Sequence, residues 1–310
     1  MGDPTVGWRV RVPATSANLG PAFDTAGLAL ARHDVLDVAV TDGLEVEVTG
    51  VGAADLPRDE RHLVVRAFRA ACDDLGWQPP GLRLHARNGI PQGRGLGSSA
   101  AAVVAGVVAA WALCPDVGAR DDDRVLRLAT ELEGHPDNVA ACLIGGAVLS
   151  WDGPCGVRAD RLDLAPGVDP VVLVPTATLS THVARGLLPA VVPHADAAYN
   201  AGRAALLVAA LTWDPELLLA ATEDRLHQRQ RTAAMPASLA LVDRLRATGH
   251  AAVVSGAGPS VLVLARRSAD EDGEVQAISR SVPEGWTVLP LDVDPAGARV
   301  ERPTGQVSSR

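Results

Sequence analysis

The chain has 310 residues, of which 47% are hydrophobic and 21% are charged, the balance of a globular protein with a sizeable apolar core. Its formal net charge of −9 argues against nucleic acid or an anionic membrane as the main partner. No apolar run reaches the length of a membrane span and no amino-terminal stretch has a secretory pattern, so we expect a cytoplasmic protein.

Lysine is absent from the sequence, so all 28 of its Lys and Arg residues are arginine. This excludes mechanisms that need a lysine, such as Schiff-base catalysis or a phosphate-binding P-loop. The four cysteines form no C-x-x-C pair, and the histidines show no metal-ligand spacing. We therefore expect reduced thiols and no zinc site.

The first predicted elements are strands. Alternation of apolar and polar residues predicts a strand over residues 8–14, followed by the turn-rich loop "TSANLGPAFDTAG". Two further alternating segments, residues 34–41 and 44–49, flank the dipeptide Asp42-Gly43. Because Asp-Gly is a typical turn of two-residue hairpins, this pattern predicts that the two strands pair as a β-hairpin.

Helices and strands then alternate irregularly up to residue 151. We expect a helix that stops at Gly76, a strand in "LRLHAR", a helix over Ser98–Trp111, a helix in "DDDRVLRLATELEG", and a short helix or turn leading into a strand. The helix over Ser98–Trp111 is apolar on all sides and should be buried on all sides. The residues expected on the buried faces of the first and third helices are Leu63, Ala67, Ala71, Leu75, Val125, Leu128 and Leu132.

The second half follows a stretch rich in Pro, Gly and Asp between Trp151 and Pro170. The residue pattern of this second half predicts a strand in "VVLVP", helices over roughly residues 196–222 and 236–248, and two apolar strands joined by "SGAGPS". Since strands and helices do not alternate regularly, we predict an α+β fold with two domains, residues 1–160 and 161–310.

The segment "PQGRGLGSSAAAVVAG" points to phosphate binding. Its glycines let backbone N–H groups converge without interference from Cβ atoms, and the helix directly behind adds the positive end of its dipole. Ser98 and Ser99 stand where a hydroxyl can contact a phosphate oxygen or a magnesium ion, and Arg94 adds charge. The alternative is a tight strand-to-helix turn with a serine N-cap. The spacing matches neither a Rossmann fingerprint nor a Walker A motif.

The same segment resembles the P-x-x-x-G-L-G-S-S-A signature of the GHMP kinases, a family of small-molecule kinases. "VPATSANLGPAFDTAG" is similar to the amino-terminal motif of that family, and "SGAGPSVLVL" to its carboxy-terminal glycine motif. Within the family, "PATSANLGP", "ELEGHPDNVAACLIGG" and "STHVARGLLP" resemble the homoserine kinase branch. Three ordered motifs that span most of the chain are far more specific than any one of them.

The resemblance implies ATP-dependent phosphorylation of the L-homoserine hydroxyl, with Mg²⁺, in a cleft between a ribosomal S5-like and a ferredoxin-like domain. It also implies a possible homodimer. The residues implied to contact ATP are Pro91, Gly93, Arg94, Gly95, Leu96, Gly97, Ser98, Ser99, Ala100 and Ala101. The residues implied to bind the metal ion are Ser98, Ser99 and Glu133.

The substrate would be recognised by its charges. A carboxylate matches the fork of an arginine guanidinium, which favours Arg185 and Arg231, and the ammonium group can be accepted by Asp24. The residues implied to bind substrate are Asn18, Asp24, His135, Asn138, Arg185, Arg231 and Gly258, and those implied in catalysis are Asn138, Ser99 and Glu133.

The identity of the catalytic base is open at this point. Several kinases of the family place an aspartate where this sequence has Asn138, and an amide is no base at neutral pH. Asp137 is adjacent, but we expect positioning and electrostatics to dominate, with the proton leaving late. Alternatives are a GHMP kinase for a mevalonate-type alcohol, a catalytically silent sensor of this fold, and a nicotinamide dehydrogenase, which the glycine spacing disfavours.

Overall fold

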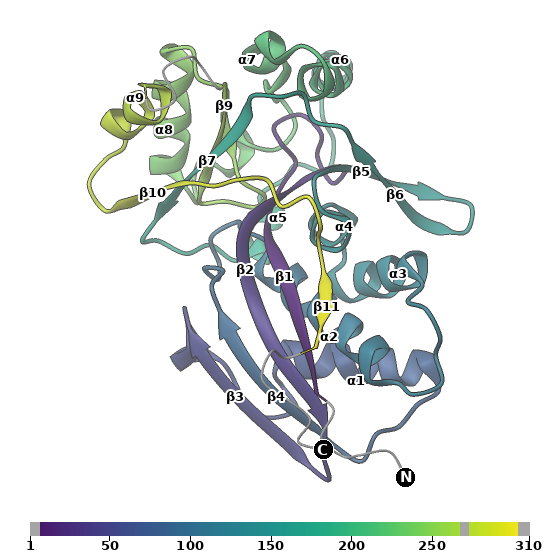
Figure 1. Ribbon diagram of the computed structural model, residues 1–310. Coiled ribbons are helices and arrows are strands. Elements are labelled where there is room, and N and C mark those ends of the chain that lie inside the picture. Colours follow the sequence, from purple (N-terminus) through teal and green to yellow (C-terminus); the bar gives the residue numbers. More distant parts are fainter. Residues whose placement is uncertain (1–6, 267–272, 303–310) are drawn as a thin grey trace.

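The computed structural model describes residues 7–266 and 273–302, and this part of the chain contains one sheet of seven strands and one of four (Figure 1). The amino-terminal half, purple to blue, builds most of the larger sheet, and the green and yellow carboxy-terminal half builds the smaller one. The predicted α+β fold is therefore confirmed. Within the described ranges, no helix has the length and apolarity to cross a bilayer.

The first sheet has the strand order β11-β1-β2-β4-β3, and β5 pairs with both β2 and β6. Its strands are β1 (Trp8–Ala17), β2 (Ala26–Val40), β3 (Leu44–Gly50), β4 (Leu82–Asn88), β5 (Ala147–Gly153), β6 (Gly156–Leu162) and β11 (Arg299–Glu301). The predicted strands at residues 8–14 and in "LRLHAR" are confirmed as β1 and β4. The late strand β11 pairs antiparallel with β1, so the end of the chain returns to the first sheet.

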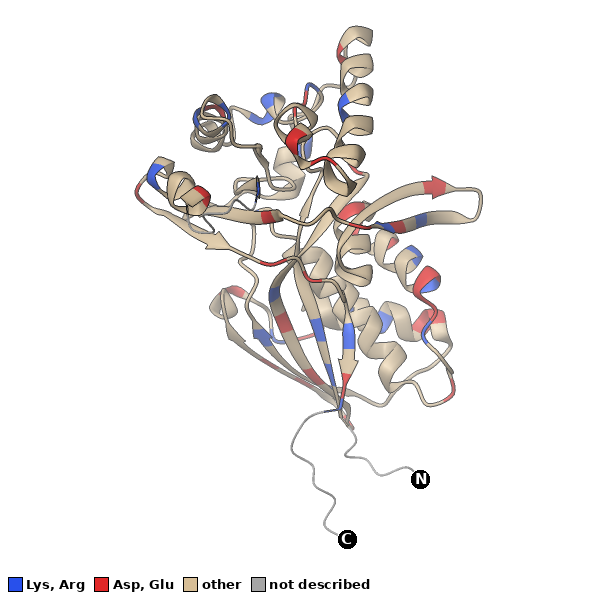
Figure 2. Cartoon of the chain, turned by 45° about the horizontal axis from the view of Figure 1, so that its top comes forward, with Lys and Arg blue, Asp and Glu red and all other residues tan. Residues whose placement is uncertain are grey.

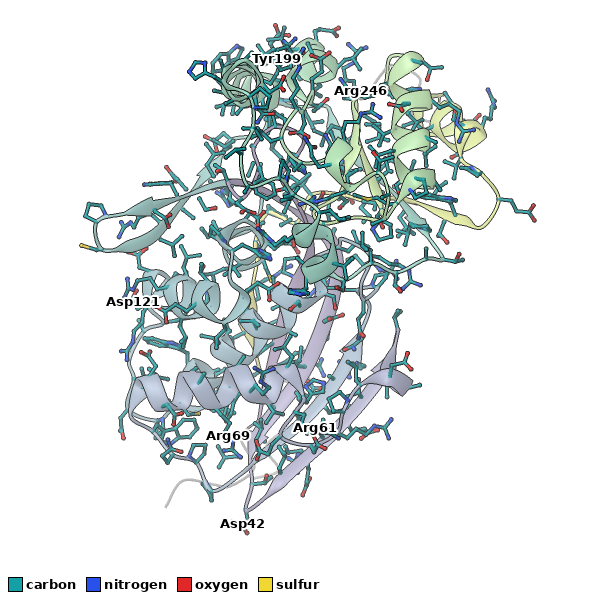
Figure 3. All side chains as sticks on the ribbon, turned by 180° about the vertical axis from the view of Figure 1, so that it is seen from behind. Asp42, Arg61, Arg69, Asp121, Tyr199 and Arg246 are labelled. Carbon is teal, nitrogen blue, oxygen red and sulfur yellow. The ribbon has the colours of Figure 1, made fainter. Side chains whose placement is uncertain are left out.

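The predicted hairpin of β2 and β3 is wrong, because β4 lies between them. β4 pairs antiparallel with β2 and parallel with β3, so that Leu82 stands opposite both Val40 and Leu44. The connection between β2 and β3 contains Asp42, which lies at the tip of the sheet in Figure 3. It is wide enough for β4 to lie between the two strands. There the Leu82 N–H donates to the Gly43 carbonyl (2.9 Å). The pairing of β4 with a strand on each side therefore decides the strand order here, and the local turn signal of Asp42-Gly43 does not.

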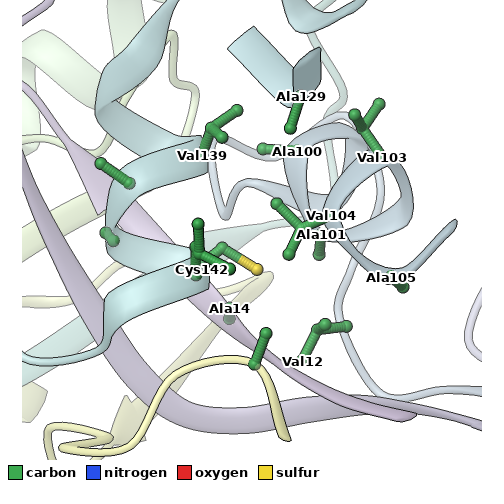
Figure 4. Close-up of a cluster of buried hydrophobic side chains, with 14 of the residues drawn as sticks. Val12, Ala14, Ala100, Ala101, Val103, Val104, Ala105, Ala129, Val139 and Cys142 are labelled. Carbon is green, nitrogen blue, oxygen red and sulfur yellow. The ribbon is translucent and has the colours of Figure 1, made fainter. Parts of the chain in front are cut away.

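Four helices cover one face of the first sheet, with α2 at their centre. They are α1 (Leu63–Leu75), α2 (Ser98–Leu113), α3 (Asp122–Glu133) and α4 (Pro136–Ile144). Figure 4 shows alanines and valines of α2 packed among side chains of β1, α3 and α4, among them Val12, Ala129 and Cys142. Helix α2 is buried on all sides, as predicted. Gly106 permits this close packing, because a Cβ there would lie 2.4 Å from the Val64 carbonyl oxygen of α1.

The predicted end and the predicted buried face of α1 are confirmed, whereas the predicted buried face of α3 is partly wrong. α1 ends at Gly76, which is left-handed (φ 69°), as predicted. α3 is capped by Asp121, whose side chain accepts a hydrogen bond from the Arg124 N–H. However, Leu132 is 41% exposed, so the predicted buried face of α3 is wrong there. The side chains of α3 that are buried are Val125, Leu126 and Ala129.

The second sheet has the order β10-β7-β9-β8. Its strands are β7 (Val168–Pro175), β8 (Ala252–Val254), β9 (Val261–Arg266) and β10 (Trp286–Pro290), and its helices include α8 (Pro236–Ala247) and α9 (Gly273–Ser281). The two strands predicted around "SGAGPS" are confirmed as β8 and β9, which pair antiparallel.

The long helix predicted over residues 196–222 is interrupted. It is replaced by α6 (His194–Thr212), the 3-10 turn η2 (Pro215–Leu217) and the short helix α7 (Leu218–Ala221). The break falls just before Pro215, which cannot continue a helix from the preceding turn and instead starts a new one behind Asp214. Acidic and basic residues are interspersed over both parts of the molecule (Figure 2).

Candidate active site

Three motifs that are far apart in the sequence meet in one cleft between the two sheets. The Ser255 hydroxyl, at the end of β8, donates to the Gly95 carbonyl of the glycine loop (2.6 Å). The Asn18 amide, in the loop after β1, donates to the Gly256 carbonyl (3.0 Å). These contacts join the amino-terminal motif, the glycine loop and the "SGAGPS" turn, and residues of all three line the cleft.

The glycine loop ends in an uncapped helix. Gly93, Gly95 and Gly97 are all left-handed, with φ between 63° and 69°, which only glycine adopts readily. Gly97 is the N-cap of α2 and no side chain of the described residues caps this helix, so the alternative of a serine N-cap is wrong. The first-turn N–H groups and the positive end of the α2 dipole are therefore available to an anion beside Ser98.

Arg94 holds the loop in place. Its guanidinium donates to the backbone carbonyls of Pro175 (3.0 Å), Thr176 (2.9 Å) and Gln92 (3.1 Å). These donors tie the loop to the end of β7. Arg94 therefore fixes the loop, and since it also lines the cleft, its contribution of charge to phosphate binding stays a prediction.

Glu133 and Ser99 form the acidic side of the cleft. The Ser99 hydroxyl donates to Glu133 Oε2 (2.7 Å), so the start of α2 and the end of α3 are joined through two oxygen-bearing side chains. Burial raises the pKa of Glu133, and the Ser99 hydrogen bond opposes this shift. Both groups are hard oxygen donors, the class that Mg²⁺ prefers.

His135, Asp137 and Asn138 form a hydrogen-bonded cluster at the start of α4. Asp137 Oδ1 accepts from His135 Nδ1 (3.0 Å) and from the Asn138 N–H (2.7 Å). Burial would lower the pKa of His135, but the hydrogen bond to Asp137 and the charges of Asp137 and Glu133 raise it above its usual value. The buried Thr15 hydroxyl donates to Asn138 Oδ1 (2.7 Å), which fixes the orientation of that amide.

A cation and an anion face each other on another part of the cleft. Arg185, on the short helix α5 (Thr181–Gly186), binds Asp24 through Nη1 (3.0 Å) and Nη2 (2.5 Å). The hydrogen bond to Asp24 raises the pKa of Arg185. Arg231 is only 1% exposed, and burial together with the charge of Arg185 lowers its pKa to about 10. The two guanidinium groups lie 5.4 and 5.6 Å from the ring centre of Phe23.

Most residues singled out from the sequence line this cleft, and a few do not. Those that line it are Asn18, Gly93, Arg94, Gly95, Leu96, Gly97, Ser98, Ser99, Glu133, His135, Asn138, Arg185 and Arg231. Pro91, Ala100 and Ala101 are buried beside it, and Gly256 and Ala257 take the place expected for Gly258. Asp24 reaches the cleft through its pair with Arg185. Thr181, which lies in the motif "STHVARGLLP", and Leu179 also line the cleft, and neither was singled out from the sequence.

A second cavity of about 230 Å³ adjoins the glycine loop and was not predicted. Its walls include apolar residues of β1, β2 and α1 together with Asn88 and Gln92, and Ser98 and Ser99 line both spaces. His62 is 4% exposed, and within the described part of the chain neither of its ring nitrogens has a partner. Burial lowers the pKa of His62, so it is neutral near pH 7 and offers one donor and one acceptor to a ligand.

Family models match both halves of the chain. Residues 62–146 match the GHMP kinases N terminal domain, and residues 206–287 match the GHMP kinases C terminal domain. The first match contains the glycine loop and Glu133. The second contains Arg231 and the "SGAGPS" turn.

Named relatives cover almost the entire chain. Homoserine kinase of Streptomyces avermitilis is 56% identical over 294 residues, which are 94% of this chain and 95% of that protein. Homoserine kinase of Clavibacter michiganensis is 53% identical over 94% of this chain and 93% of that protein. The crystal structure of homoserine kinase from Cytophaga hutchinsonii superposes with a TM-score of 0.84 at 26% identity, covering 97% of this chain and 99% of that one.

Proposed function

We propose that this chain, which belongs to the GHMP kinases and within them to the homoserine kinases, phosphorylates L-homoserine with ATP in the cleft described above. The reaction transfers the γ-phosphoryl group to the side-chain hydroxyl and gives O-phospho-L-homoserine for threonine synthesis. We place the enzyme in the cytoplasm, since the pattern of the sequence indicates no membrane partner.

The observation that carries the proposal is the pairing of Asp24 with Arg185 beside Arg231 in the cleft that holds the glycine loop. L-Homoserine is a zwitterion, so its ammonium group can pair with Asp24 while its carboxylate receives donors from the two guanidinium groups. This arrangement leaves the hydroxyl end of the substrate to face the phosphate-binding part of the cleft, next to Asn138.

The nucleotide would occupy the loop and the second cavity. The triphosphate fits the uncapped start of α2, and the adjoining cavity, apolar with a few polar groups, has the character of a base-binding pocket. We assign the adenine ring to this cavity, with His62, Asn88 and Gln92 as its polar contacts.

The residues present fit a magnesium ion. Ser99 and Glu133 supply a hydroxyl and a carboxylate, and no group of three or more acidic, His or Cys ligands occurs within residues 7–266 and 273–302. A donor set this small suits an ion that also takes its ligands from ATP phosphates and water. When bound, the ion neutralises charge on the β- and γ-phosphates.

The chain's own residues then orient the reacting hydroxyl. Thr15 donates to the oxygen of the Asn138 amide, and the NH₂ group of Asn138 donates one hydrogen to Asp137 Oδ1 (3.3 Å), which leaves its second hydrogen to donate toward the cleft. The hydroxyl oxygen attacks the γ-phosphorus while the bond to the β–γ bridging oxygen breaks and ADP leaves. In a loose transition state the proton departs late, and it can pass to a phosphate oxygen.

Asp137 provides a test of whether a base is needed. Its Oδ1 already accepts from His135 and from the Asn138 backbone, so it acts as a structural acceptor. Asp137→Asn preserves that oxygen, and we expect kcat to fall by less than about tenfold, whereas a lost general base costs about 10²- to 10⁴-fold. A loss of several orders of magnitude, with normal KM values and thermal stability, would identify Asp137 as the base.

A coupled ADP-release assay tests the proposed substrate. L-Homoserine should be turned over, while 4-hydroxybutyrate, which lacks the ammonium group, should have a kcat/KM at least about 10²-fold lower because it cannot form the charged contact with Asp24. D-Homoserine, mevalonate and galactose serve as further comparisons. Preferred turnover of mevalonate would favour the mevalonate-type alternative, and nucleotide binding without ADP release from any substrate would favour a sensor.

A further inference from the structure

His227 is a buried histidine in direct contact with the substrate end of the cleft. It has no exposed surface and lies between α7 and the 3-10 turn η3 (Arg229–Arg231). Its ring packs against Phe23 with 5.0 Å between centroids. Its two nitrogens contact different parts of the site: Nε2 lies 2.7 Å from the Gly20 carbonyl oxygen, and Nδ1 lies 3.2 Å from Arg231 Nη1.

These two partners determine the protonation state of the ring. The Gly20 carbonyl can only accept a hydrogen bond, so His227 Nε2 must carry a proton. The Arg231 guanidinium can only donate, so Nδ1 must be unprotonated. Both contacts are satisfied together by one species, the neutral imidazole with its proton on Nε2. A doubly protonated ring would direct an N–H group at the Arg231 cation.

The surroundings of the ring support that state. Burial lowers the pKa of His227 and the positive charge of Arg231 lowers it further, while Asp224, the Gly20 carbonyl and Asp24 act in the opposite direction. Asp224 Oδ1 lies 3.7 Å from His227 Nε2, on the side that carries the proton. Asp224 Oδ2 also accepts from the backbone N–H groups of His227 (3.1 Å) and Gln228 (2.8 Å), which holds the loop in its conformation.

Among the described residues, the hydrogen-bond partners of the Arg231 guanidinium all lie at Nη1. Nη1 donates both to His227 Nδ1 and to the Gly256 carbonyl (3.2 Å). Nε is buried and has no partner among the described residues. The opposite edge of the guanidinium, formed by Nε and Nη2, has no hydrogen-bond partner among the described residues, and Arg231 lines the cleft. A carboxylate binds such an edge through two parallel hydrogen bonds.

We propose that His227 is a positioning residue: by accepting from Arg231 Nη1 and donating to Gly20, it turns the free edge of Arg231 toward the substrate carboxylate. The proposal rests on the proposed function, which places that carboxylate at Arg231. It also explains how the loop after β1 and the loop before η3 keep their relative positions, because the His227 ring contacts both of them.

Two substitutions of His227 test the roles of its two ring nitrogens separately. His227→Gln places an amide donor near the Nε2 position and removes the acceptor for Arg231. His227→Asn places an oxygen near the Nδ1 position and keeps that acceptor. We expect the KM for L-homoserine to rise about tenfold in His227→Gln and distinctly less in His227→Asn, since a hydrogen bond to a charged group is lost only in the former. The KM for ATP and kcat should change less than about twofold in both, because neither kinetic constant depends on the carboxylate contact.

A spectroscopic measurement provides a readout that a merely structural role would not produce. In enzyme labelled with ¹⁵N-histidine, the resonances lost in His227→Gln should be those of a neutral ring protonated on Nε2 at pH 7.5. A ring protonated on Nδ1 or on both nitrogens overturns the proposal. Equal increases of the L-homoserine KM in the two variants also overturn it.

Arg231→Lys distinguishes failure of this inference from failure of the proposed function. If Arg231→Lys raises the KM for L-homoserine and His227→Gln does not, only the role of His227 is wrong. If Arg231→Lys leaves that KM unchanged, the carboxylate does not bind at Arg231 and the role of His227 is overturned, whereas the proposed function fails only if the unmodified enzyme does not turn over L-homoserine in the ADP-release assay. Thermal unfolding of each variant confirms that the compared proteins are folded.

Discussion

Glu133→Gln should lower kcat by about 10²- to 10³-fold while the KM for L-homoserine changes little. The substitution keeps the size of the side chain and an oxygen to accept from the Ser99 hydroxyl, but it removes the negative charge at the end of α3. That charge matters most when the phosphate charge is redistributed in the transition state, so the effect falls on kcat. The concentration of Mg²⁺ required for half-maximal rate should rise in the same variant.

Glu131→Gln is the matched control, because it makes the same change of charge at an exposed position two residues earlier on α3. It should leave kcat, both KM values and the magnesium requirement unchanged. If Glu133→Gln behaves like this control, the acidic side of the cleft has no part in the reaction. If both variants lose activity equally, the effect is one of overall charge.

Local structure could be read from the sequence wherever local signals act alone. The apolar helix α2, the stop of α1 at Gly76 and the strand pair around "SGAGPS" follow from periodicity and glycine placement. The hairpin prediction failed because its turn signal is local, whereas the pairing of β2 with β4 joins residues 42 to 52 positions apart. Leu132 was misplaced for a related reason, since periodicity does not say which side of a helix its neighbours occupy.

For the cleft, the sequence identified the motifs but not the contacts between them. The glycine loop and Glu133 carry recognisable patterns, and the structure brings them together. The direct pairing of Asp24 with Arg185 joins positions 161 residues apart, which no spacing in the sequence reveals. His62 and His227 likewise could not be identified from the sequence, because the role of a single histidine depends on its burial and its hydrogen-bond partners, which only the structure gives.

Gly95→Ala should weaken ATP binding by at least about 10²-fold. At this residue a Cβ atom would lie 2.1 Å from the Ser255 carbonyl oxygen and 3.0 Å from both backbone N and O of Gly258, and backbone atoms in a closed turn cannot move aside cheaply. The loop must shift away from the "SGAGPS" turn, which breaks the hydrogen bond from the Ser255 hydroxyl to the Gly95 carbonyl. The N–H groups that converge on the phosphates then lose their arrangement, and several charge-assisted hydrogen bonds are lost together.

Gly118→Ala separates this steric effect from backbone strain. Gly118 is also left-handed, with φ 58° against 69° for Gly95, but a Cβ there would meet no atom within 4 Å. Gly118→Ala should lose about 1–2 kcal/mol of unfolding free energy, the cost of a left-handed alanine, and Gly95→Ala should lose more because the clash adds to that strain. Only Gly95→Ala should lose affinity in a calorimetric titration with ATP. An ATP affinity within about threefold of the unmodified enzyme, in a Gly95→Ala protein that is folded, would show that the triphosphate is not held by this loop, because the clash displaces the loop whatever the strain costs.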